Sequence, residues 1–353
     1  MANMSNTKQN KGFSDVDPMA ESRKKDHIEL AFKSQVDRMH LDHRFDYEPM
    51  LAGHPEDNSW PAFNFLGKTL RAPMWVSSMT GGTKMAAIIN KNLARACHEF
   101  GMGMGLGSCR SLLTGDKHLD DFNVRSIIGD ELPLYANLGI AQVEALIKNK
   151  ETELIDKLIH KLKADGLIIH VNPLQEWLQP EGDVIQAPPV ETIAQLLDMS
   201  TYPIIVKEVG QGFGPRSIAA LLKMPLKAID FAANGGTNFA RLELLRSSEM
   251  HSEVYGPVVQ LGHSAEEMVG WANDLHGSDS VKCQHIIISG GIKHFLDGYY
   301  LISRSKFKAI YGQASGFLKY ARDDYETLRY YVNLQIKGLE LCRQMLHLKE
   351  VKQ

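Results

Sequence analysis

Short apolar runs alternate with segments of helical periodicity along most of the chain. Eight runs have the character of buried strands and end in small or polar residues: Met74–Ser78, Gly101–Gly105, Leu134–Asn137, Leu167–His170, Ile204–Lys207, Ala228–Phe231, His285–Ser289 and Ala309–Tyr311. Between most of them, apolar residues recur at spacings of three and four, as in helices: Met85–Phe100, Val143–Leu162, Val190–Met199, Ser217–Leu222, Ala265–Leu275 and Phe295–Ser303. Strands that alternate with helices form parallel βαβ units. The pattern predicts an α/β protein, either closed into a (β/α)8 TIM barrel or opened into a doubly wound sheet.

The remaining segments predict an N-terminal extension and one long connection within the barrel. Residues 1–22 are polar and weakly patterned, which predicts a mobile tail. A short amphipathic segment follows, from Arg23 to about Lys33. We expect residues 23–353 to form a single barrel domain that begins with an N-terminal substrate-clamp segment at 23–65. Residues 234–280 connect the sixth and seventh strands, and connections of this length are often functional.

Composition narrows the class of protein and its surroundings. The chain has 353 residues, of which 44% are hydrophobic and 23% charged, as in globular proteins. A net charge of −3 argues against nucleic-acid binding, although a local basic cluster for a small anion remains compatible with it. No stretch approaches the roughly 18 apolar residues of a membrane span, and the polar start has no signal core. Four cysteines lack CxxC spacing: Cys97, Cys109, Cys283 and Cys342. We therefore expect a cytoplasmic protein without disulfides and without a membrane partner.

The first three predicted strands end in residues that suit a flat ring. In a barrel the loops after the strands converge on one face, so strand-end residues carry the chemistry. Small residues at Ser77–Gly82 let a ring approach the backbone, or they form a tight turn. Alternating glycines from Gly101 to Gly107 leave one strand face empty for a ring or for a close strand crossing. Asn137 ends the third strand, either as a donor to a flavin carbonyl or as a turn former.

The fourth and fifth predicted strands end in ionisable groups. The stretch His170–Glu176 places four polar side chains within seven residues. Its single carboxylate, beside amide and imidazole groups, suits Mg²⁺ with water and phosphate oxygens completing the shell, or it caps a polar loop. The fifth strand is apolar until Lys207, and a lysine at a buried strand end needs an anion or a strong acceptor. A flavin N1/O2 edge is one acceptor, and a surface pair with Glu208 is the alternative.

Glycine-rich turns after the last three strands predict a phosphate site. They are Asn234–Thr237, Ser289–Lys293 and Gly312–Ser315. Barrels often bind phosphate at the loops after strands seven and eight, and the backbone N–H groups of a helix start favour an anion. A separate basic cluster, Arg23–His27, is either a solvated face or a clamp for the phosphates of a substrate.

Taken together, these blocks resemble the type 2 isopentenyl-diphosphate isomerases, flavoenzymes of the (β/α)8 class, from about Arg23 to about Leu318. The blocks occur in the family order, and the most diagnostic is His170–Glu176. The others are Arg23-Lys24 with His27, Ser78–Gly82, Gly107-Ser108, Asn137–Gly139, Lys207–Gly210, Gly235–Phe239 and Ser289–Gly291. Cys109 stands where the family usually has Gln. Val209–Pro215 and Gln313–Phe317 also depart from the family pattern.

The resemblance implies a role for each matching residue. Cofactor contacts with FMN are implied for Ser78, Met79, Thr80, Ser108, Asn137, Lys207 and Thr237, with the FMN phosphate on Gly290, Gly291, Ala314 and Ser315. Substrate contacts are implied for Arg23, Lys24, His27, Ser108, Arg110, His170, Asn172 and Gln175. The implied catalytic residues are Gln175, His170 and Lys207, and the implied Mg²⁺ ligand is Glu176.

The resemblance also implies the reaction, which moves the double bond between isopentenyl and dimethylallyl diphosphate. Reduced FMN, with NADPH as its reductant, would serve as acid and base, and Lys207 would stabilise the anionic flavin. The family implies a homo-oligomer, a tetramer or an octamer. One rival is an FMN-dependent 2-hydroxy-acid oxidoreductase, for which His294 supplies a histidine but no convincing His–Arg pair. The other is a flavin-binding protein that has lost catalysis, which Cys109 would allow.

Overall fold

The computed structural model describes residues 19–78 and 80–349 and divides the chain into two compact units. The N-terminal unit comprises residues 1–46 and 349–353, and the barrel unit is Tyr47–Leu348. In the N-terminal unit, α1 spans Ala20–Leu30 and the 3-10 turn η1 spans Arg38–His40. The helix begins three residues before the predicted amphipathic segment. Residues 1–18 of the predicted tail lie outside the described residues.

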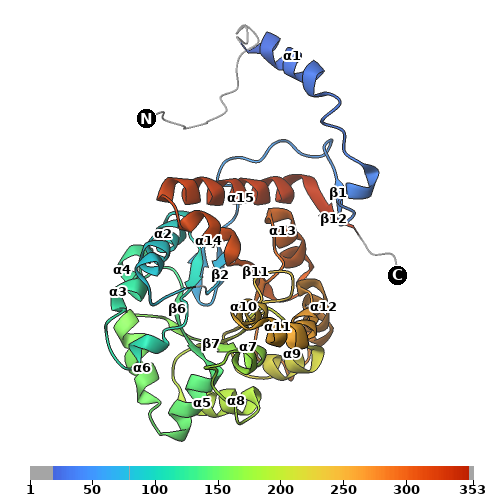
Figure 1. Cartoon of the computed structure of the whole chain (residues 1–353). Coiled ribbons are helices and arrows are strands. Elements are labelled where there is room, and N and C mark those ends of the chain that lie inside the picture. Colours follow the sequence, from blue (N-terminus) through green and yellow to red (C-terminus); the bar gives the residue numbers. More distant parts are fainter. Residues whose placement is uncertain (1–18, 79, 350–353) are drawn as a thin grey trace. The chain divides into compact units, whose positions relative to one another are not determined.

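Eight parallel strands close the barrel unit (Figure 1). They are β4 (Met74–Val76), β5 (Gly103–Gly105), β6 (Leu134–Gly139), β7 (Gly166–Val171), β8 (Ile204–Glu208), β9 (Ala228–Asp230), β10 (His285–Ser289) and β11 (Lys308–Gln313). Each follows its neighbour around the ring, and β11 pairs with β4 to close it. All eight predicted strands are confirmed, and so is the barrel. The doubly wound alternative is wrong.

Tight packing inside the barrel explains the alternating glycines of β5. A Cβ atom added at Gly103 would lie 2.3 Å from the Trp75 ring. One added at Gly105 would lie 2.6 Å from Ile168 Cδ1. The empty strand face is therefore filled by Trp75 and Ile168, both fully buried. Close packing, and not a bound ring, accounts for these two glycines.

Helices surround the barrel, and most of them follow the predicted periodicity. The confirmed ones are α2 (Lys84–Phe100), α8 (Pro189–Met199), α9 (Pro215–Leu222), α12 (Ala265–Leu275) and α13 (Phe295–Arg304). The single helix predicted at 143–162 is wrong, because α5 (Ile140–Lys148) and α6 (Glu153–Leu162) are separate. Lys150 between them has a φ of 60°, a left-handed conformation that no continuous α-helix contains.

Several elements had no predicted counterpart. The longest is α15 (Tyr325–Met345), which packs against α2, α13 and α14 (Ser315–Ala321). Short pieces also follow the strands: η2 (Arg110–Leu112), α3 (Leu119–Phe122), α4 (Arg125–Ile128) and α7 (Pro173–Leu178). Two of the four strands outside the barrel, β1 (Phe45–Tyr47) and β12 (Leu346–Leu348), also had no predicted counterpart. None of the helices in the described ranges is long and apolar enough to cross a membrane.

One end of the barrel is covered by a hairpin, β2 (Phe63–Phe65) and β3 (Lys68–Leu70). Lys68 Nζ donates to the carbonyl oxygens of Asp130 and Leu132, just before β6 begins. The Phe65 ring packs edge-on against His285, the first residue of β10. These contacts place the hairpin at the amino-terminal ends of the strands, so the carboxyl ends remain for the loops.

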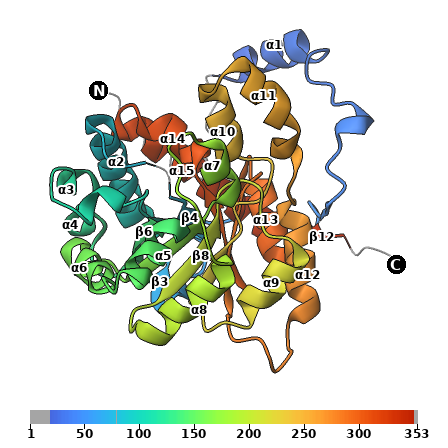
Figure 2. The same cartoon turned by 60° about the horizontal axis from the view of Figure 1, so that its bottom comes forward.

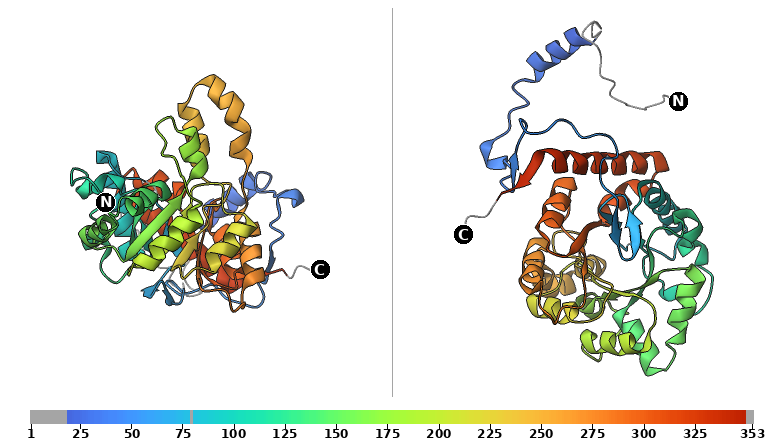
Figure 3. Two further views of the ribbon diagram at one scale, coloured as in Figure 1. Left: turned by 90° about the horizontal axis from the view of Figure 1, so that it is seen from below. Right: turned by 180° about the vertical axis from the view of Figure 1, so that it is seen from behind.

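The connection at 234–280 is largely helical. It contains α10 (Phe239–Arg246), α11 (Glu249–Tyr255), the 3-10 turn η3 (Gly256–Gln260) and α12. In Figure 2, and in the left view of Figure 3, α7, α10 and α11 rise together from one end of the barrel. Helices α7 and α10 pack against each other. The long connection therefore builds a wall beside the strand ends.

Candidate active site

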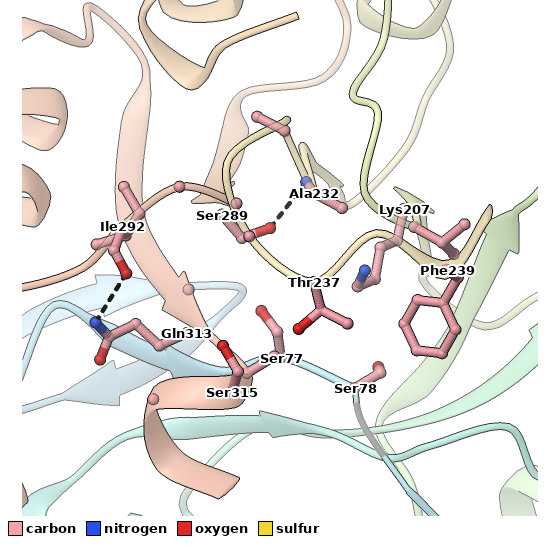
Figure 4. A pocket seen from close by; sticks show the side chains of 18 residues that line it. Ser77, Ser78, Lys207, Ala232, Thr237, Phe239, Ser289, Ile292, Gln313 and Ser315 are labelled. Carbon is pink, nitrogen blue, oxygen red and sulfur yellow. Dashed lines mark hydrogen bonds between the residues drawn. The ribbon is translucent and has the colours of Figure 1, made fainter. Parts of the chain in front are cut away.

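Two adjoining cavities lie at the carboxyl ends of the strands. The first is shown in Figure 4, and its lining includes seven of the predicted cofactor residues: Ser78, Lys207, Thr237, Gly290, Gly291, Ala314 and Ser315. The second shares Ser78 and Lys207 with the first. Its lining adds four further predicted residues: Ser108, Asn137, His170 and Gln175. Residues far apart in the sequence thus line one continuous region.

Other predicted site residues lie beside these cavities or outside them. Met79 lies outside the described residues. Thr80 lines neither cavity, and a Cβ at Gly107 would lie 2.5 Å from the Thr80 carbonyl oxygen. Arg110 lines a neighbouring cavity together with Ser108. The exposed side chains of Arg23, Lys24 and His27 belong to α1 of the N-terminal unit, and their role stays a prediction.

The glycine loops after β9 and β10 approach each other backbone to backbone. Gly290 has a φ of 86°, and a Cβ there would lie 2.0 Å from the Ala233 carbonyl oxygen. At Gly235 a Cβ would lie 3.1 Å from the Gly291 Cα. Only glycine fits such a contact, which leaves a side-chain-free backbone surface on the first cavity. This surface suits a phosphate group bound by main-chain N–H groups.

The helix start that was expected to assist a phosphate is already capped. Helix α13 begins at Phe295, four residues after Gly291. The His294 side chain accepts from the Asp297 N–H, and Asp297 Oδ2 accepts from the Lys293 N–H at 2.9 Å. A carboxylate therefore occupies the helix terminus. An anion in the cavity would meet the glycine loops and not the first turn of α13.

Unpartnered polar atoms show where the described residues leave room for a polar ligand. The hydroxyl oxygens of Ser77 and Ser78 are buried and have no hydrogen-bond partner. Both line the first cavity, as Figure 4 shows. Buried hydroxyls without a partner are costly, so their satisfaction by a bound group is expected. Together with the glycine surface, they fit a flavin mononucleotide with its phosphate at the loops.

Lys207 is a buried side chain rather than half of a surface pair. Its Nζ donates to the Glu208 carbonyl oxygen at 2.6 Å. The Glu208 carboxylate is buried too, and its Oε2 accepts from the N–H groups of Gly210, Gln211 and Gly212 at 2.6 to 2.8 Å. Burial raises the pKa of Glu208, and these hydrogen bonds and Lys207 oppose the rise. A surface ion pair between Lys207 and Glu208 is therefore wrong, because both side chains are buried and the Glu208 carboxylate binds the N–H groups of the loop that follows it.

A second acid beside Lys207 was missed from the sequence. Asp230 on β9 is fully buried and pairs in register with Lys207 on β8. Ser289 Oγ donates to the Asp230 carboxylate, and the Ala232 N–H donates to Ser289 Oγ at 2.8 Å. Burial raises the pKa of Asp230, whereas the charge of Lys207 lowers it. The available signal was an aspartate within the apolar run Ala228–Phe231.

Hydrogen bonding fixes the state of His170. Asn137 Nδ2 donates to the Leu106 carbonyl oxygen at 2.9 Å, so Asn137 Oδ1 faces His170 Nδ1 at 2.7 Å as an acceptor. The proton of the neutral ring must then lie on Nδ1, which leaves Nε2 as an acceptor. Burial first, and then the positive charge of Lys207, lower the pKa of His170 to about 4. His170 is therefore neutral at pH 7.

The remaining polar residues of the β7 end form a chain of hydrogen bonds. Asn172 Nδ2 donates to Gln175 Oε1 at 3.1 Å and to Glu176 Oε1 at 2.9 Å. Gln175 Nε2 donates to Glu243 Oε1 at 3.2 Å, and Arg246 Nη1 donates to Glu243 Oε2 at 2.7 Å. Glu243 on α10 is buried and was not predicted, although it lies in the connection expected to be functional. Both ends of the Gln175 amide are thereby oriented.

Glu176 is available as one ligand of a metal ion but cannot form a site alone. No group of three or more His, Cys, Asp or Glu side chains within residues 19–78 and 80–349 could hold a metal. Glu176 Oε1 accepts from Asn172, and Oε2 accepts from the Asp183 N–H at 2.7 Å. Each oxygen keeps a second lone pair. Mg²⁺ with water and substrate phosphate oxygens fits this donor set.

The substitution at Cys109 falls in the core and not on the cavities. Cys109 is fully buried and lines neither cavity. Its Sγ donates to the Gly107 carbonyl oxygen at 3.3 Å, and its N–H donates to the Asn137 carbonyl oxygen at 2.8 Å. Burial raises the pKa of its thiol to about 12. All four cysteines are buried.

Comparison with known proteins shows which class the fold and site define. No family model matches the chain. The recombinant flavin-binding domain of baker's yeast flavocytochrome b2 aligns with a TM-score of 0.56 at 13% identity, over 86% of this chain and 72% of that one. A mandelate oxidase variant with (S)-mandelic acid aligns with a TM-score of 0.54 at 12% identity, over 87% and 88%. These two structures share the (β/α)8-barrel fold of this chain, whose two cavities lie at the carboxyl ends of the strands.

Sequence relatives identify the family within that class. The isopentenyl-diphosphate delta-isomerase of Rickettsia felis is 34% identical over 329 residues, 90% of each chain. The enzyme of the same name from Rickettsia akari is 32% identical over 330 residues, covering 91% of this chain and 92% of that one. This chain belongs to the isopentenyl-diphosphate delta-isomerase family, and the type 2 resemblance of its motifs is confirmed.

Proposed function

We propose that this protein interconverts isopentenyl diphosphate and dimethylallyl diphosphate, with FMN and Mg²⁺ bound at the carboxyl end of its barrel. The observation that carries the proposal is sequence identity. Two relatives named for this activity are 34% and 32% identical to this chain over about 90% of its length. The gathering of Lys207, His170 and Gln175 around one cavity supports it further. The reaction shifts a double bond and involves no net oxidation.

Our proposal for the cofactor site rests on the first cavity. The phosphate would bind to the glycine loops at Gly290 and Gly291, with Ala314 and Ser315 beside it. Ser78 would supply a hydroxyl to the ring, and Lys207 would face its polar edge. When bound and reduced, with NADPH proposed as the reductant, FMN would supply an acid and base stronger than ordinary side chains offer at neutral pH.

The residues of the second cavity would orient the substrate. Gln175 is held between Asn172 and Glu243, so its amide would lie at a fixed angle beside the reacting carbons. His170 would accept a hydrogen bond through Nε2. Lys207, with Asp230 on the next strand, would keep a positive charge where negative charge develops. Positioning of this kind contributes by lowering the entropic cost of the reaction.

The diphosphate would be bound by charge. We propose that Glu176 holds Mg²⁺ and that Arg110 and Ser108 contact the phosphates. Arg23, Lys24 and His27 are proposed as further substrate-binding residues. Charge-assisted hydrogen bonds are worth roughly 1.5–3 kcal/mol each. Several of them are needed, because the reacting end of this substrate has only carbon and hydrogen. A cytoplasmic homo-oligomer, as the family implies, completes the proposal.

The oxidoreductase rival lacks its expected machinery in the described residues. His294, the candidate base, caps α13 and lines neither cavity. The linings of the two cavities contain no arginine to bind a carboxylate. This arrangement favours the isomerase over an oxidase of 2-hydroxy acids.

Product analysis tests the proposal. The purified protein is incubated without oxygen with isopentenyl diphosphate, FMN, Mg²⁺ and NADPH, and dimethylallyl diphosphate is measured. We expect turnover that requires both FMN and the reductant. Absence of product from protein that has bound FMN would refute the isomerase, and oxygen consumption with 2-hydroxy acids would support the rival.

A further inference from the structure

Asp183 connects two residues that the proposed function assigns to the diphosphate and its metal. It lies in the loop between α7 and α8. Its Oδ2 accepts from Arg110 Nη1 at 2.8 Å and from Gln142 Nε2 at 2.8 Å. Its own N–H donates to Glu176 Oε2 at 2.7 Å. One loop residue thus links η2, α5 and α7.

The direction of these hydrogen bonds is fixed by their partners. Gln142 Oε1 accepts from the Gly139 N–H at 2.9 Å, which leaves Nε2 as the donor toward Asp183. Arg110 can only donate. Asp183 must therefore act as an acceptor from both side chains, which a carboxylate does best.

The contact with Asp183 restricts the side chain of Arg110. Its side chain is 61% exposed, and an exposed arginine without a fixed partner samples many rotamers. Asp183 engages one of its five N–H donors and leaves the others for an anion. A guanidinium oriented in advance loses less entropy when it binds a phosphate.

We propose that Asp183 is a positioning residue. It orients Arg110 toward the diphosphate and holds the Arg110 side chain at a fixed position relative to Glu176. This inference rests on the proposed function, because it assumes that Arg110 and Glu176 serve the diphosphate. Asp183 acts through Arg110 and does not itself touch the substrate. Removing its carboxylate weakens diphosphate binding without disturbing the flavin.

The test measures binding of inorganic pyrophosphate to FMN-loaded protein in the presence of Mg²⁺. We expect Asp183→Ala to raise the dissociation constant about tenfold, and Asp183→Asn, which keeps the acceptor oxygen, to raise it less. Arg110→Gln raises it at least as much. In the Arg110→Gln background, Asp183→Ala adds less than about twofold, because the residue acts through that arginine.

A matched control separates this role from simple anchoring of the loop. The Glu144 carboxylate accepts from the N–H groups of Gln186 and Ala187 in the same loop and anchors that loop as Asp183 does. Glu144→Gln should leave the dissociation constant for pyrophosphate unchanged. Independent, multiplying effects at 110 and 183, an equal loss with Glu144→Gln, or no loss with Asp183→Ala would each overturn the proposal.

The titration needs no turnover, so it is independent of the test of the isomerase. Wild-type protein that binds pyrophosphate but forms no dimethylallyl diphosphate would refute the proposed function and leave the role of Asp183 to the binding data. Wild-type protein that does not bind pyrophosphate would overturn the inference itself.

Discussion

At the scale of single residues, the polar groups at the end of β7 are held by partners from other elements. Asn137 of β6 orients His170, and Glu243 of α10 orients Gln175. Glu176 is bound on both oxygens, by Asn172 and by the Asp183 N–H. Each side chain therefore has one preferred direction before any ligand arrives, which favours a rigid site.

Glu176→Gln tests the metal ligand. The amide keeps the shape of the side chain but removes its charge and one acceptor. We expect turnover to fall by roughly 100-fold or more, with a weakened dependence on Mg²⁺, while flavin absorbance of the purified protein stays unchanged. Steady-state rates across a Mg²⁺ series provide the measurement.

Glu181→Gln is the control, since this exposed carboxylate in the same region pairs only loosely with Arg246 at 3.3 Å. Near-normal turnover of Glu176→Gln would remove Glu176 from the metal role.

His170 gives stability a pH dependence. Its pKa in the folded protein is about 4, below the ordinary value of about 6.5. Between these values the unfolded chain binds a proton that the folded chain does not. The free energy of unfolding should therefore fall as pH drops from about 6.5 to about 4, by an amount on the order of 2 kcal/mol.

His170→Gln, which cannot titrate, should show a flatter dependence over that range. Urea unfolding of both proteins at pH 7.5 and at pH 4.5 measures the difference. An equal change in the free energy of unfolding for both proteins would contradict this account. It would mean that His170 is already protonated, or is solvated, in the folded state.

Local sequence showed which residues the strand ends carry but not their partners. Lys207 and the His170–Glu176 block were recognisable, because each interrupts or follows an apolar run. Asp230 and Glu243 were missed, because their importance comes from long-range contacts with Ser289 and Gln175. The burial of Glu208 was also missed. It depends on the following loop folding back onto the carboxylate, which a local sequence pattern does not predict.

At the scale of elements, the β2–β3 hairpin and α4 are tied to the barrel through Asp165. Its carboxylate pairs with Lys68 Nζ of β3 at 2.5 Å and with Arg125 Nη2 of α4 at 2.8 Å. It also accepts from the Leu134 N–H at the start of β6 at 2.8 Å. The Arg125 side chain is only 5% exposed, and the Asp165 carboxylate is the nearer of the two that balance its positive charge.

Asp165→Asn should therefore destabilise the protein without reaching the site at the opposite end of the barrel. An uncompensated buried arginine makes the expected loss about 2–4 kcal/mol in the free energy of unfolding, with flavin binding retained. Asp130→Asn is the control, because that carboxylate is 89% exposed and 3.9 Å from Arg125. Equal stability of the two variants, measured by urea unfolding, would contradict this account.

Elements were predictable where periodicity was strong. The eight strands and α2, α8, α9, α12 and α13 followed from it, whereas the break between α5 and α6 depended on the conformation of Lys150. Helix α15 was missed although it is the longest, since it follows the last strand and belongs to no βα repeat. The short hairpin strands offered too few residues for alternation to be read.

At the scale of the whole molecule, the chain consists of a barrel unit and an N-terminal unit with exposed basic residues. The closed barrel was predictable, because eight βα repeats leave few other arrangements. The oligomeric state stays a prediction. The substrate-clamp role of residues 23–65 also stays a prediction, since no local sequence pattern defines what these residues bind.

Arg23→Ala combined with Lys24→Ala tests the clamp. Removing two charges from the proposed diphosphate site should raise KM by roughly tenfold or more, with little change in kcat and in flavin content. Lys33→Ala, a charge from the same unit without an assigned role, is the control. An unchanged KM in steady-state kinetics would contradict the clamp and favour the alternative that these residues only form a solvated face.

The burial of the four thiols has a practical consequence for measuring motion in this protein. Alkylating reagents attack the thiolate, and burial suppresses that form at Cys97, Cys109 and Cys283 by raising their pKa. A maleimide dye would therefore react first with a cysteine introduced on an exposed helix surface. Fluorescent labels could be attached to α1 and to α11 in the natural background, and energy transfer between them would report whether the two units approach when diphosphate is added.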